Sequence, residues 1–193
     1  MLLHILCKLL QTKPAYMKYT PFLLLLFSLA NSSCKKDGLT KETQNGANTF
    51  SCLIDGEIFK PAKSEGSLFN SDPVLYGGLS ISDGYSIARV SAAYKASYPR
   101  KNITIEIDHF HGIGEYTLSN TDNIIYYRED TTIPPFGTSY SSFYTLNGKI
   151  TITKDDRANA ILSGTFEFTA TSPDDPGRII TATSGRFDLN YKK

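Results

Sequence analysis

From residue 49 onward, short runs rich in Val, Ile, Thr, Tyr and Phe alternate with clusters of Gly, Pro, Asn, Asp and Ser. The clusters recur about every eight to twelve residues, which is typical of antiparallel strands joined by tight turns. The sequence therefore predicts an all-β protein of about eight to ten strands. The expected architecture is an antiparallel β-sandwich, with a bent up-and-down β-barrel as the alternative. In either arrangement, β-sheet covers one hydrophobic core from both sides.

Strand patterns differ in clarity along this part of the chain. The segment 101–111 alternates clearly and places Ile103, Ile105 and Ile107 on one face. The segment 85–95 also fits helical spacing, and we expect a strand there because turn signals flank it on both sides.

Glycine-containing turns suggest how the strands connect. Asp55-Gly56 predicts a type I′ hairpin, and Asn147-Gly148 predicts another hairpin between strands at 140–146 and 149–154. Gly185 interrupts the last strand pattern and predicts a β-bulge.

The N-terminal part of the chain has a different character. Residues 22–30, FLLLLFSLA, form an apolar run that is shorter than the roughly 20 residues of a spanning helix. Small polar residues follow it and lead to Cys34, as at a signal-peptide cleavage site. We expect translation to start at Met17, with Lys18 as the positive flank and residues 1–16 upstream of the true start.

This segment resembles lipoprotein signal peptides, particularly those of Bacteroidetes-type lipoproteins, which often end in Ser-Cys before a charged tether, as in SSCKKDG. The resemblance implies acylation of Cys34, for example with palmitate, and attachment to a membrane of the cell envelope. The outer membrane is the expected location, with the domain facing the periplasm or the surface. Asn31 departs from the usual lipobox, which has an aliphatic residue at that place. A plain signal peptide with Cys34 as a free thiol, or a retained anchor, remains an alternative.

The chain is therefore expected to divide into a signal segment, 1–33, a lipidated cysteine with a flexible tether, 34–48, and one all-β domain, 49–191. The tether is polar and lacks aromatic residues. Residues 1–33 contain three lysines and no acid, so without them the 20 basic residues fall to 17 against 19 acidic ones. This balance offers no basic excess for nucleic-acid binding.

Four motifs, TFSCLIDG, GEYTL, GTFEFTA and GRFDL, punctuate residues 49–189. They resemble a family of small Bacteroidetes-type lipoproteins known only as a domain of unknown function. The shared positions are mainly glycines and apolar strand residues. The resemblance therefore implies a common fold and location, and it transfers no catalytic or binding residue. Cys52 alternates with Phe50 and Ile54 in the first motif, so we expect it in the core.

His109 and His111 are the candidates for a metal site. In a strand that continues to residue 111 they would project from the same face, and two imidazoles can ligate one ion. A third ligand is not identifiable, so histidines at the sheet rim are the favoured interpretation. We predict no metal, cofactor or catalytic residue. The acidic pairs Asp155-Asp156 and Asp174-Asp175 fit turns better than calcium loops.

Aromatic residues gather around the segment 124–144. The candidate ligand-binding residues are Tyr126, Tyr127, Tyr140 and Tyr144. Exposed tyrosines can stack on sugar rings or anchor a protein partner. We expect a non-enzymatic binding module for a glycan or small ligand. The alternative is a structural or assembly accessory of an envelope protein complex.

Overall fold

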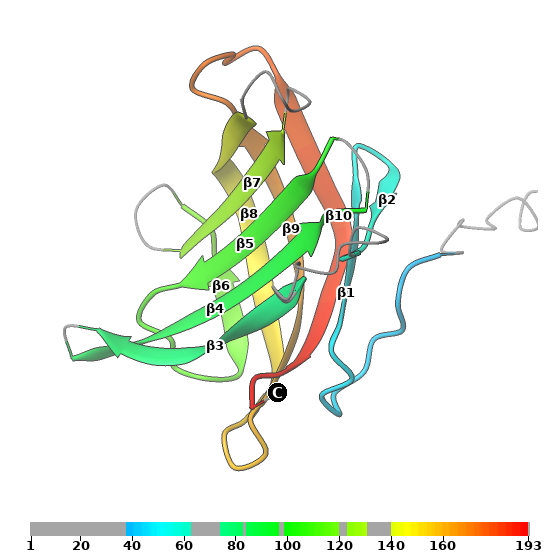
Figure 1. The fold of residues 1–193 in the computed structure, drawn as a ribbon. Coiled ribbons are helices and arrows are strands. Elements are labelled where there is room, and N and C mark those ends of the chain that lie inside the picture. Colours follow the sequence, from blue (N-terminus) through cyan, green and yellow to red (C-terminus); the bar gives the residue numbers. More distant parts are fainter. Residues whose placement is uncertain are drawn as a thin grey trace, which may run out of the picture. The chain divides into compact units, whose positions relative to one another are not determined.

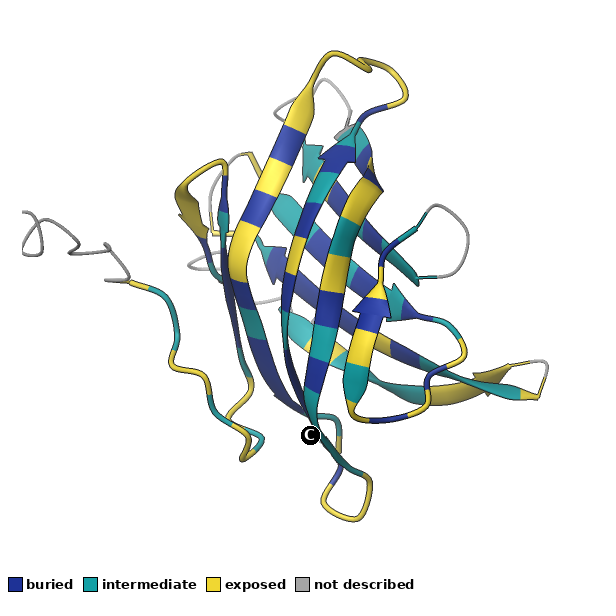
Figure 2. Cartoon of the chain, turned by 180° about the vertical axis from the view of Figure 1, so that it is seen from behind, coloured by how far each residue is buried: buried dark blue, intermediate teal, exposed yellow. Residues whose placement is uncertain are grey.

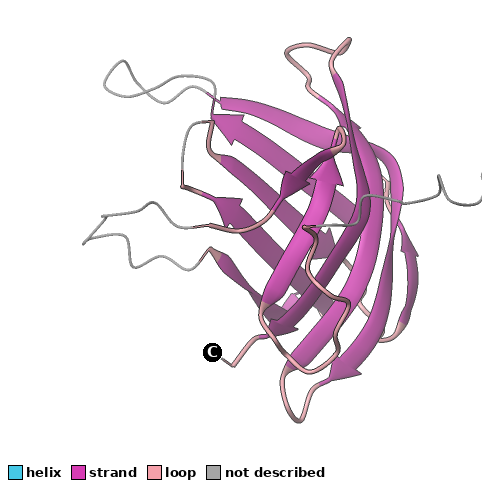
Figure 3. Cartoon of the chain, turned by 90° about the vertical axis from the view of Figure 1, so that its right-hand side faces the viewer, coloured by secondary structure: helices cyan, strands magenta, loops and turns pink. Residues whose placement is uncertain are grey.

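The structure, a computed structural model, describes residues 38–62, 74–82, 84–96, 99–119, 123–130 and 140–192. The signal segment and Cys34 lie outside these residues. The described residues form strands and contain no helix that could cross a membrane (Figure 3). The strands are β1 (Thr49–Ile54), β2 (Glu57–Phe59), β3 (Leu75–Ser82), β4 (Tyr85–Tyr94), β5 (Lys101–Ile107), β6 (Gly114–Thr117), β7 (Asn123–Asp130), β8 (Tyr140–Asp156), β9 (Ile161–Thr171) and β10 (Ile179–Asn190).

All ten strands belong to one antiparallel sheet with the order β2-β1-β10-β9-β8-β7-β5-β4-β3, and β6 pairs with β8 beside this path (Figure 1). From β3 to β5 and from β7 to β10, strands that follow one another in the chain are also neighbours in the sheet. The sheet curls, so that its two halves cover one core (Figure 1). The predicted antiparallel all-β fold is confirmed, and the curled sheet is compatible with a sandwich or a barrel-like arrangement.

The segment after β2 reaches across to the other end of the sheet. Ala62 forms a parallel bridge with Tyr94 at the end of β4. The amide of Ala62 donates to the carbonyl of Ala93 at 3.1 Å, and the amide of Lys95 donates to the carbonyl of Ala62 at 2.7 Å. These bonds join the β2 end of the sheet to β4.

Alternate residues of the strands fill the inside of the curl (Figure 2). Ile103, Ile105 and Ile107 of β5 are at most 1% exposed, while the residues between them are partly exposed. Burying each such side chain stabilises the fold by about 1.5–3 kcal/mol. Cys52 is fully buried, and burial raises the pKa of its thiol to about 12. Its predicted place in the core is confirmed.

Three predictions about local structure are also confirmed. The segment 85–95 is strand β4 over nearly its whole length. Asp55 and Gly56 both have positive φ angles, 50° and 85°, as the type I′ turn between β1 and β2 requires. The register of β10 against β9 shifts between Ala182 and Gly185, which is the expected bulge.

The predicted hairpin at Asn147-Gly148 is wrong, because β8 is one continuous strand of 17 residues. Its residues 140–144 pair with β7 and its residues 149–152 pair with β6, so the strand changes partner near the dipeptide. The register against β9 shifts at the same place, between Thr145 and Asn147. Gly148 has a φ of 152°, and a Cβ atom there would lie 2.3 Å from the carbonyl oxygen of Glu167. The glycine therefore allows a close approach of the β8 and β9 backbones next to the bulge.

The segment 38–48, called the strap below, lies against β1 and β10 (Figure 1). The amide of Thr40 donates to Ser51 Oγ at 3.0 Å, and Arg186 Nη1 donates to the carbonyl of Thr40 at 3.1 Å. At its other end, Asn48 Oδ1 accepts a 2.8 Å bond from the amide of Asn190. The expected flexible tether over 34–48 is therefore corrected from residue 38 onward, where the chain is bound to the domain.

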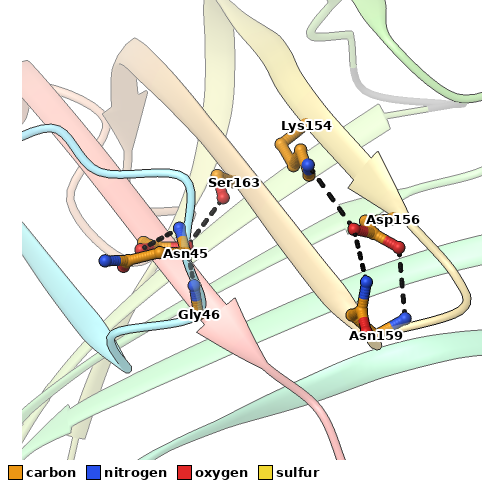
Figure 4. A network of polar contacts seen from close by, with 7 residues as sticks. Asn45, Gly46, Lys154, Asp156, Asn159 and Ser163 are labelled. Carbon is orange, nitrogen blue, oxygen red and sulfur yellow. Dashed lines mark hydrogen bonds and ion pairs between the residues drawn. The ribbon is translucent and has the colours of Figure 1, made fainter.

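Asp188 of β10 holds the strap and is only 1% exposed. Its partners Asn45, Gly46 and Ser163 are labelled in Figure 4. Its carboxylate accepts hydrogen bonds from the strap and from β9. The donors are Thr43 Oγ1 (2.6 Å), the amides of Asn45 (3.1 Å), Gly46 (2.9 Å) and Ala47 (3.0 Å), and Ser163 Oγ (2.7 Å). Burial acts to raise the pKa of Asp188, but these bonds, led by that from Thr43, outweigh it and hold the pKa below its ordinary value.

Candidate functional site

Tyr126 and Tyr144 form an aromatic pair on the outside of the sheet. They are direct partners in the β7–β8 ladder, and their rings meet edge to face with centroids 5.6 Å apart and an interplanar angle of 80°. Tyr144 is 45% exposed. Partial burial, followed by the charge of Glu106, raises the pKa of Tyr126. The pair is a partly exposed aromatic surface that can contact a ligand.

Of the other two predicted tyrosines, Tyr127 lies inside the fold. Tyr127 points into the core, is 1% exposed and packs against Phe143 with centroids 5.5 Å apart. Burial, followed by the charge of Glu129, raises its pKa above the ordinary range. Tyr127 therefore belongs to no surface site, which corrects the expectation. Tyr140 begins β8 opposite Asp130.

A pocket of about 480 Å³ lies at the ends of β4, β5 and β7. Ala93, Asn102 and Arg128 are successive partners across these strands and form its floor. Arg128 lies two residues after Tyr126 on β7, and the inward Tyr127 separates them, so the pocket and the aromatic pair share the outer side of the sheet. Tyr76 of β3, 48% exposed, also lines the pocket.

Positive charge dominates the described lining of this pocket. The cationic residues are Lys95, Arg100, Lys101 and Arg128, and Asp130 is the one carboxylate among the described lining residues. Backbone hydrogen bonds fix the positions of the residues that line the pocket. For example, the backbone amide of Asp130 donates to the carbonyl of Arg100 at 2.9 Å. The side chains therefore start from strand ends, which are rigid elements of the fold.

The side-chain amide of Asn102 also has a fixed orientation on the pocket floor. Its Oδ1 accepts a 3.1 Å bond from Thr104 Oγ1, and its Nδ2 lies 3.4 Å from Ser91 Oγ. The pocket combines cations, an oriented polar floor and nearby tyrosines, which can bind an anionic or hydroxyl-rich molecule.

His109 and His111 do not share a strand face, which corrects the geometry expected for a metal site. Strand β5 ends at Ile107, and His109 lies in a turn with a φ of 51°. His109 stacks on Tyr85 at 4.1 Å between centroids, whereas His111 stacks on Tyr116 at 4.7 Å. Within the described parts of the chain, no group of three or more His, Cys, Asp or Glu side chains could hold a metal ion.

The acidic turn residue Asp156 acts as a local cap. Its two carboxylate oxygens accept bonds from the amide and the side chain of Asn159, at 3.1 and 2.9 Å, and Lys154 lies 3.4 Å away (Figure 4). These contacts, led by the side-chain bond from Asn159, lower the pKa of Asp156. The residue stabilises the turn between β8 and β9, as expected for a turn residue.

The basic residues of the pocket were missed by the sequence analysis. The run YKASYPRK places Lys95, Arg100 and Lys101 around one connection, and this cluster was the available signal. Arg128 carries a further signal, because it shares the face of Tyr126. The sequence does not indicate that β5 pairs with β7, and this pairing is what places Arg128 beside Asn102.

The comparisons with known proteins bear on the part of the chain that supplies most of this pocket's lining. A family model described as Domain of unknown function (DUF6252) matches residues 90–188, from within β4 to Asp188. The comparisons with curated proteins and with solved structures found no match. Since the family model covers just over half of the 193 residues, the chain belongs to this family of domains of unknown function.

Proposed function

We propose that this protein is a lipoprotein of the cell envelope that is anchored through acylated Cys34 and acts as a non-enzymatic binding module. Its ligand is a glycan or a small molecule, bound on the outer side of β4, β5, β7 and β8. The apolar run at 22–30, with small residues leading to Cys34, supports the anchor. Two or three acyl chains anchor a protein stably where one does not.

One observation carries the binding role: a pocket of about 480 Å³ shares its face of the sheet with the Tyr126–Tyr144 pair. Pockets of roughly 300–1,000 Å³ are typical of small-molecule sites. A partly exposed aromatic pair beside such a pocket gives a ligand apolar surface to contact, and the rigid rings lose little side-chain entropy on binding.

A binding role fits the described lining better than catalysis does. The side chains that commonly transfer protons in enzymes are His, Asp and Glu. His109 and His111 do not line the pocket, and each stacks on a tyrosine elsewhere. Asp130 has cations and an amide as neighbours in the lining, with no second carboxylate among the described residues.

The binding role can be tested with the purified protein on a glycan array and by calorimetric titration of the ligands found. We expect Tyr144→Ala to weaken binding about tenfold, because it removes the exposed ring of the pair. Tyr85→Ala is the matched control, since Tyr85 stacks on His109 outside the pocket. An array and a small-molecule panel without any saturable binding would refute the role.

The anchor can be tested by labelling cells with palmitate. We expect label in the wild type and in Cys52→Ala, and none in Cys34→Ala. Cys52 is the matched control because it is a buried core cysteine. Unlabelled wild-type protein would refute the anchor. Protease treatment of intact cells then reports whether the domain is surface-exposed.

A role as an assembly accessory is the second candidate, and β3 supports it. This strand ends the sheet order, contains no charged residue and exposes 80% of Ile81. Natural edge strands are usually protected by charges, so an unprotected one can accept a strand from a partner. This candidate predicts a crosslinked membrane complex that Ile81→Lys abolishes. Ile113→Lys is the matched control and should preserve the complex, because Ile113 is 64% exposed but lies outside β3. Crosslinking that yields only monomer would reject it.

A further inference from the structure

One row of directly paired residues crosses the outer side of the sheet from β3 to β8. It is called the tyrosine row below and consists, in pairing order, of Tyr76, Ser91, Thr104, Tyr126 and Tyr144. Directly paired residues of neighbouring strands point to the same side of a sheet, so the whole row shares the outer side with the Tyr126–Tyr144 pair. The strands β3, β4, β5 and β7 that carry most of it lie side by side (Figure 1).

The two ends of the row are aromatic and open to solvent. Tyr76 is 48% exposed at the β3 end, and Tyr144 is 45% exposed at the β8 end. Between them, Thr104 and Tyr126 are partly exposed, whereas Ser91 is buried. Four strand spacings of about 4.8 Å separate the ends, so the row is about 19 Å long. It is therefore an extended surface rather than a single pocket.

The row itself contains no charged residue, and its central hydroxyl groups are held in place. Ser91 Oγ lies 3.0 Å from Thr104 Oγ1, and Thr104 Oγ1 donates to Asn102 Oδ1 at 3.1 Å. On one side of the row, Arg89 of β4 and Glu106 of β5 neutralise each other, with Nε and Oε2 2.8 Å apart. The row thus offers aromatic rings and hydroxyl groups, and no charge of its own.

This combination fits an uncharged sugar chain better than a compact ligand. The apolar faces of sugar rings can stack on tyrosine rings, and the hydroxyl groups of Thr104 and of the tyrosines can bond to sugar hydroxyls. A hexose in an extended chain advances by roughly 5 Å, which is close to one strand spacing. About four sugar units would therefore reach from Tyr144 to Tyr76.

On the basis of the binding role described above, we propose that the tyrosine row binds a neutral, linear oligosaccharide of about four sugar units that lies across the strands. The Tyr126–Tyr144 pair contacts one end of this chain and Tyr76 contacts the other. The affinity then depends on chain length and changes little with salt concentration, because the contacts involve no charge on the ligand.

The test titrates the purified protein by calorimetry with cello-, xylo-, manno- and malto-oligosaccharides, each from the monomer to the hexamer. We expect the affinity for at least one series to rise at least about tenfold from the dimer to the tetramer, and to change little beyond about five units. Raising the salt concentration should leave this affinity nearly unchanged. The length dependence tests the proposal on the wild type without any variant.

Two variants locate the far end of the chain. Tyr76→Ala should weaken binding of the tetramer about tenfold and leave binding of the dimer to the Tyr126–Tyr144 pair unchanged. Tyr85→Ala is the matched control, because Tyr85 of β4 pairs with Ser82 outside the row. Thermal denaturation confirms that both variants fold, and Tyr76→Leu, which also removes the ring, replaces Tyr76→Ala if that variant does not.

The outcomes separate this proposal from the binding role. Equal affinity for the dimer and the tetramer, lost in Tyr144→Ala, would keep the binding role and overturn the extended site. Tighter binding of galacturonate tetramers than of every neutral tetramer would overturn the preference for an uncharged chain. Vesicles of phosphatidylcholine are the last arm: Tyr144-dependent binding to vesicles but to no saccharide would assign the row to a lipid surface and overturn the proposal.

Discussion

The hydroxyl of Thr43 donates a 2.6 Å hydrogen bond to Oδ2 of Asp188, 145 residues later in the chain. The bond joins the strap to the last strand of the sheet. Ser163 of β9 donates to the other oxygen at 2.7 Å, so one buried carboxylate ties three parts of the chain together. This carboxylate contributes to stability and lies outside the proposed ligand site.

Asp188→Asn should lower the free energy of unfolding by about 2–4 kcal/mol, because an amide nitrogen replaces an oxygen that accepts buried hydrogen bonds. Urea denaturation measures this loss. Asp174→Asn, in the exposed loop before β10, is the matched control and should change stability by less than about 0.5 kcal/mol. Equal stability of the two variants would show that Asp188 does not hold the strap.

The contribution of Asp188 should depend on pH. Its pKa is lower in the folded state than the ordinary value near 3.9 in the unfolded chain, so the unfolded state binds more protons in acid. The stabilisation is therefore fully present above about pH 4 to 5 and is lost as the pH falls through the folded pKa. Denaturation of the wild type and of Asp188→Asn from pH 7 to about pH 3 should show the difference shrinking. A difference that grows in acid would contradict this assignment.

Gly148→Ala should destabilise the domain by roughly 3 kcal/mol, because it adds both an unfavourable φ and a contact of 2.3 Å with the Glu167 carbonyl. Gly56→Ala is the matched control. Gly56 also has a positive φ, 85°, but a Cβ atom there would meet nothing within 4 Å. We expect that variant to lose only about 1 kcal/mol in urea denaturation. Similar losses would mean that β8 and β9 do not approach each other closely at Gly148.

Tyr127 and Tyr144 should respond to mutation in opposite ways. Tyr127→Ala removes a ring that is 1% exposed and should lower the free energy of unfolding by about 3–5 kcal/mol. Tyr144→Ala should change stability by less than about 1 kcal/mol while weakening ligand binding. Denaturation and titration of the same samples check both parts. A strongly destabilised Tyr144→Ala would place Tyr144 in the fold rather than in the site.

Local patterns predicted most of the strands for a physical reason. Ile103, Ile105 and Ile107 had to face one side, because successive side chains of a strand point to opposite faces. Asp55-Gly56 formed the expected hairpin because both residues tolerate a positive φ. The similar dipeptide Asn147-Gly148 did not turn the chain. Its conformation depends on β6, β7 and β9, which come from other parts of the sequence.

The candidate site was predicted in part. The aromatic region was found, and alternation along β7 explains why Tyr126 faces out while Tyr127 faces in. The pocket itself needs pairing between strands that are distant in the sequence, such as β5 with β7. The sequence around Asp188 does not predict that it binds the strap. Its partners in the strap lie in a polar segment whose composition resembles that of a free linker.

The attachment of the strap changes how far the domain can move from a membrane. With a free chain from Cys34 to Thr49, the domain could stand about 50 Å from the anchor, at about 3.3–3.6 Å per residue. Because Thr40 is hydrogen-bonded to Ser51, the separation in sequence between Cys34 and the bound part of the chain falls to six residues, which can span at most about 20 Å. Under the proposed acylation, the domain would therefore stay close to the lipid headgroups. It would then contact molecules that arrive at the bilayer surface.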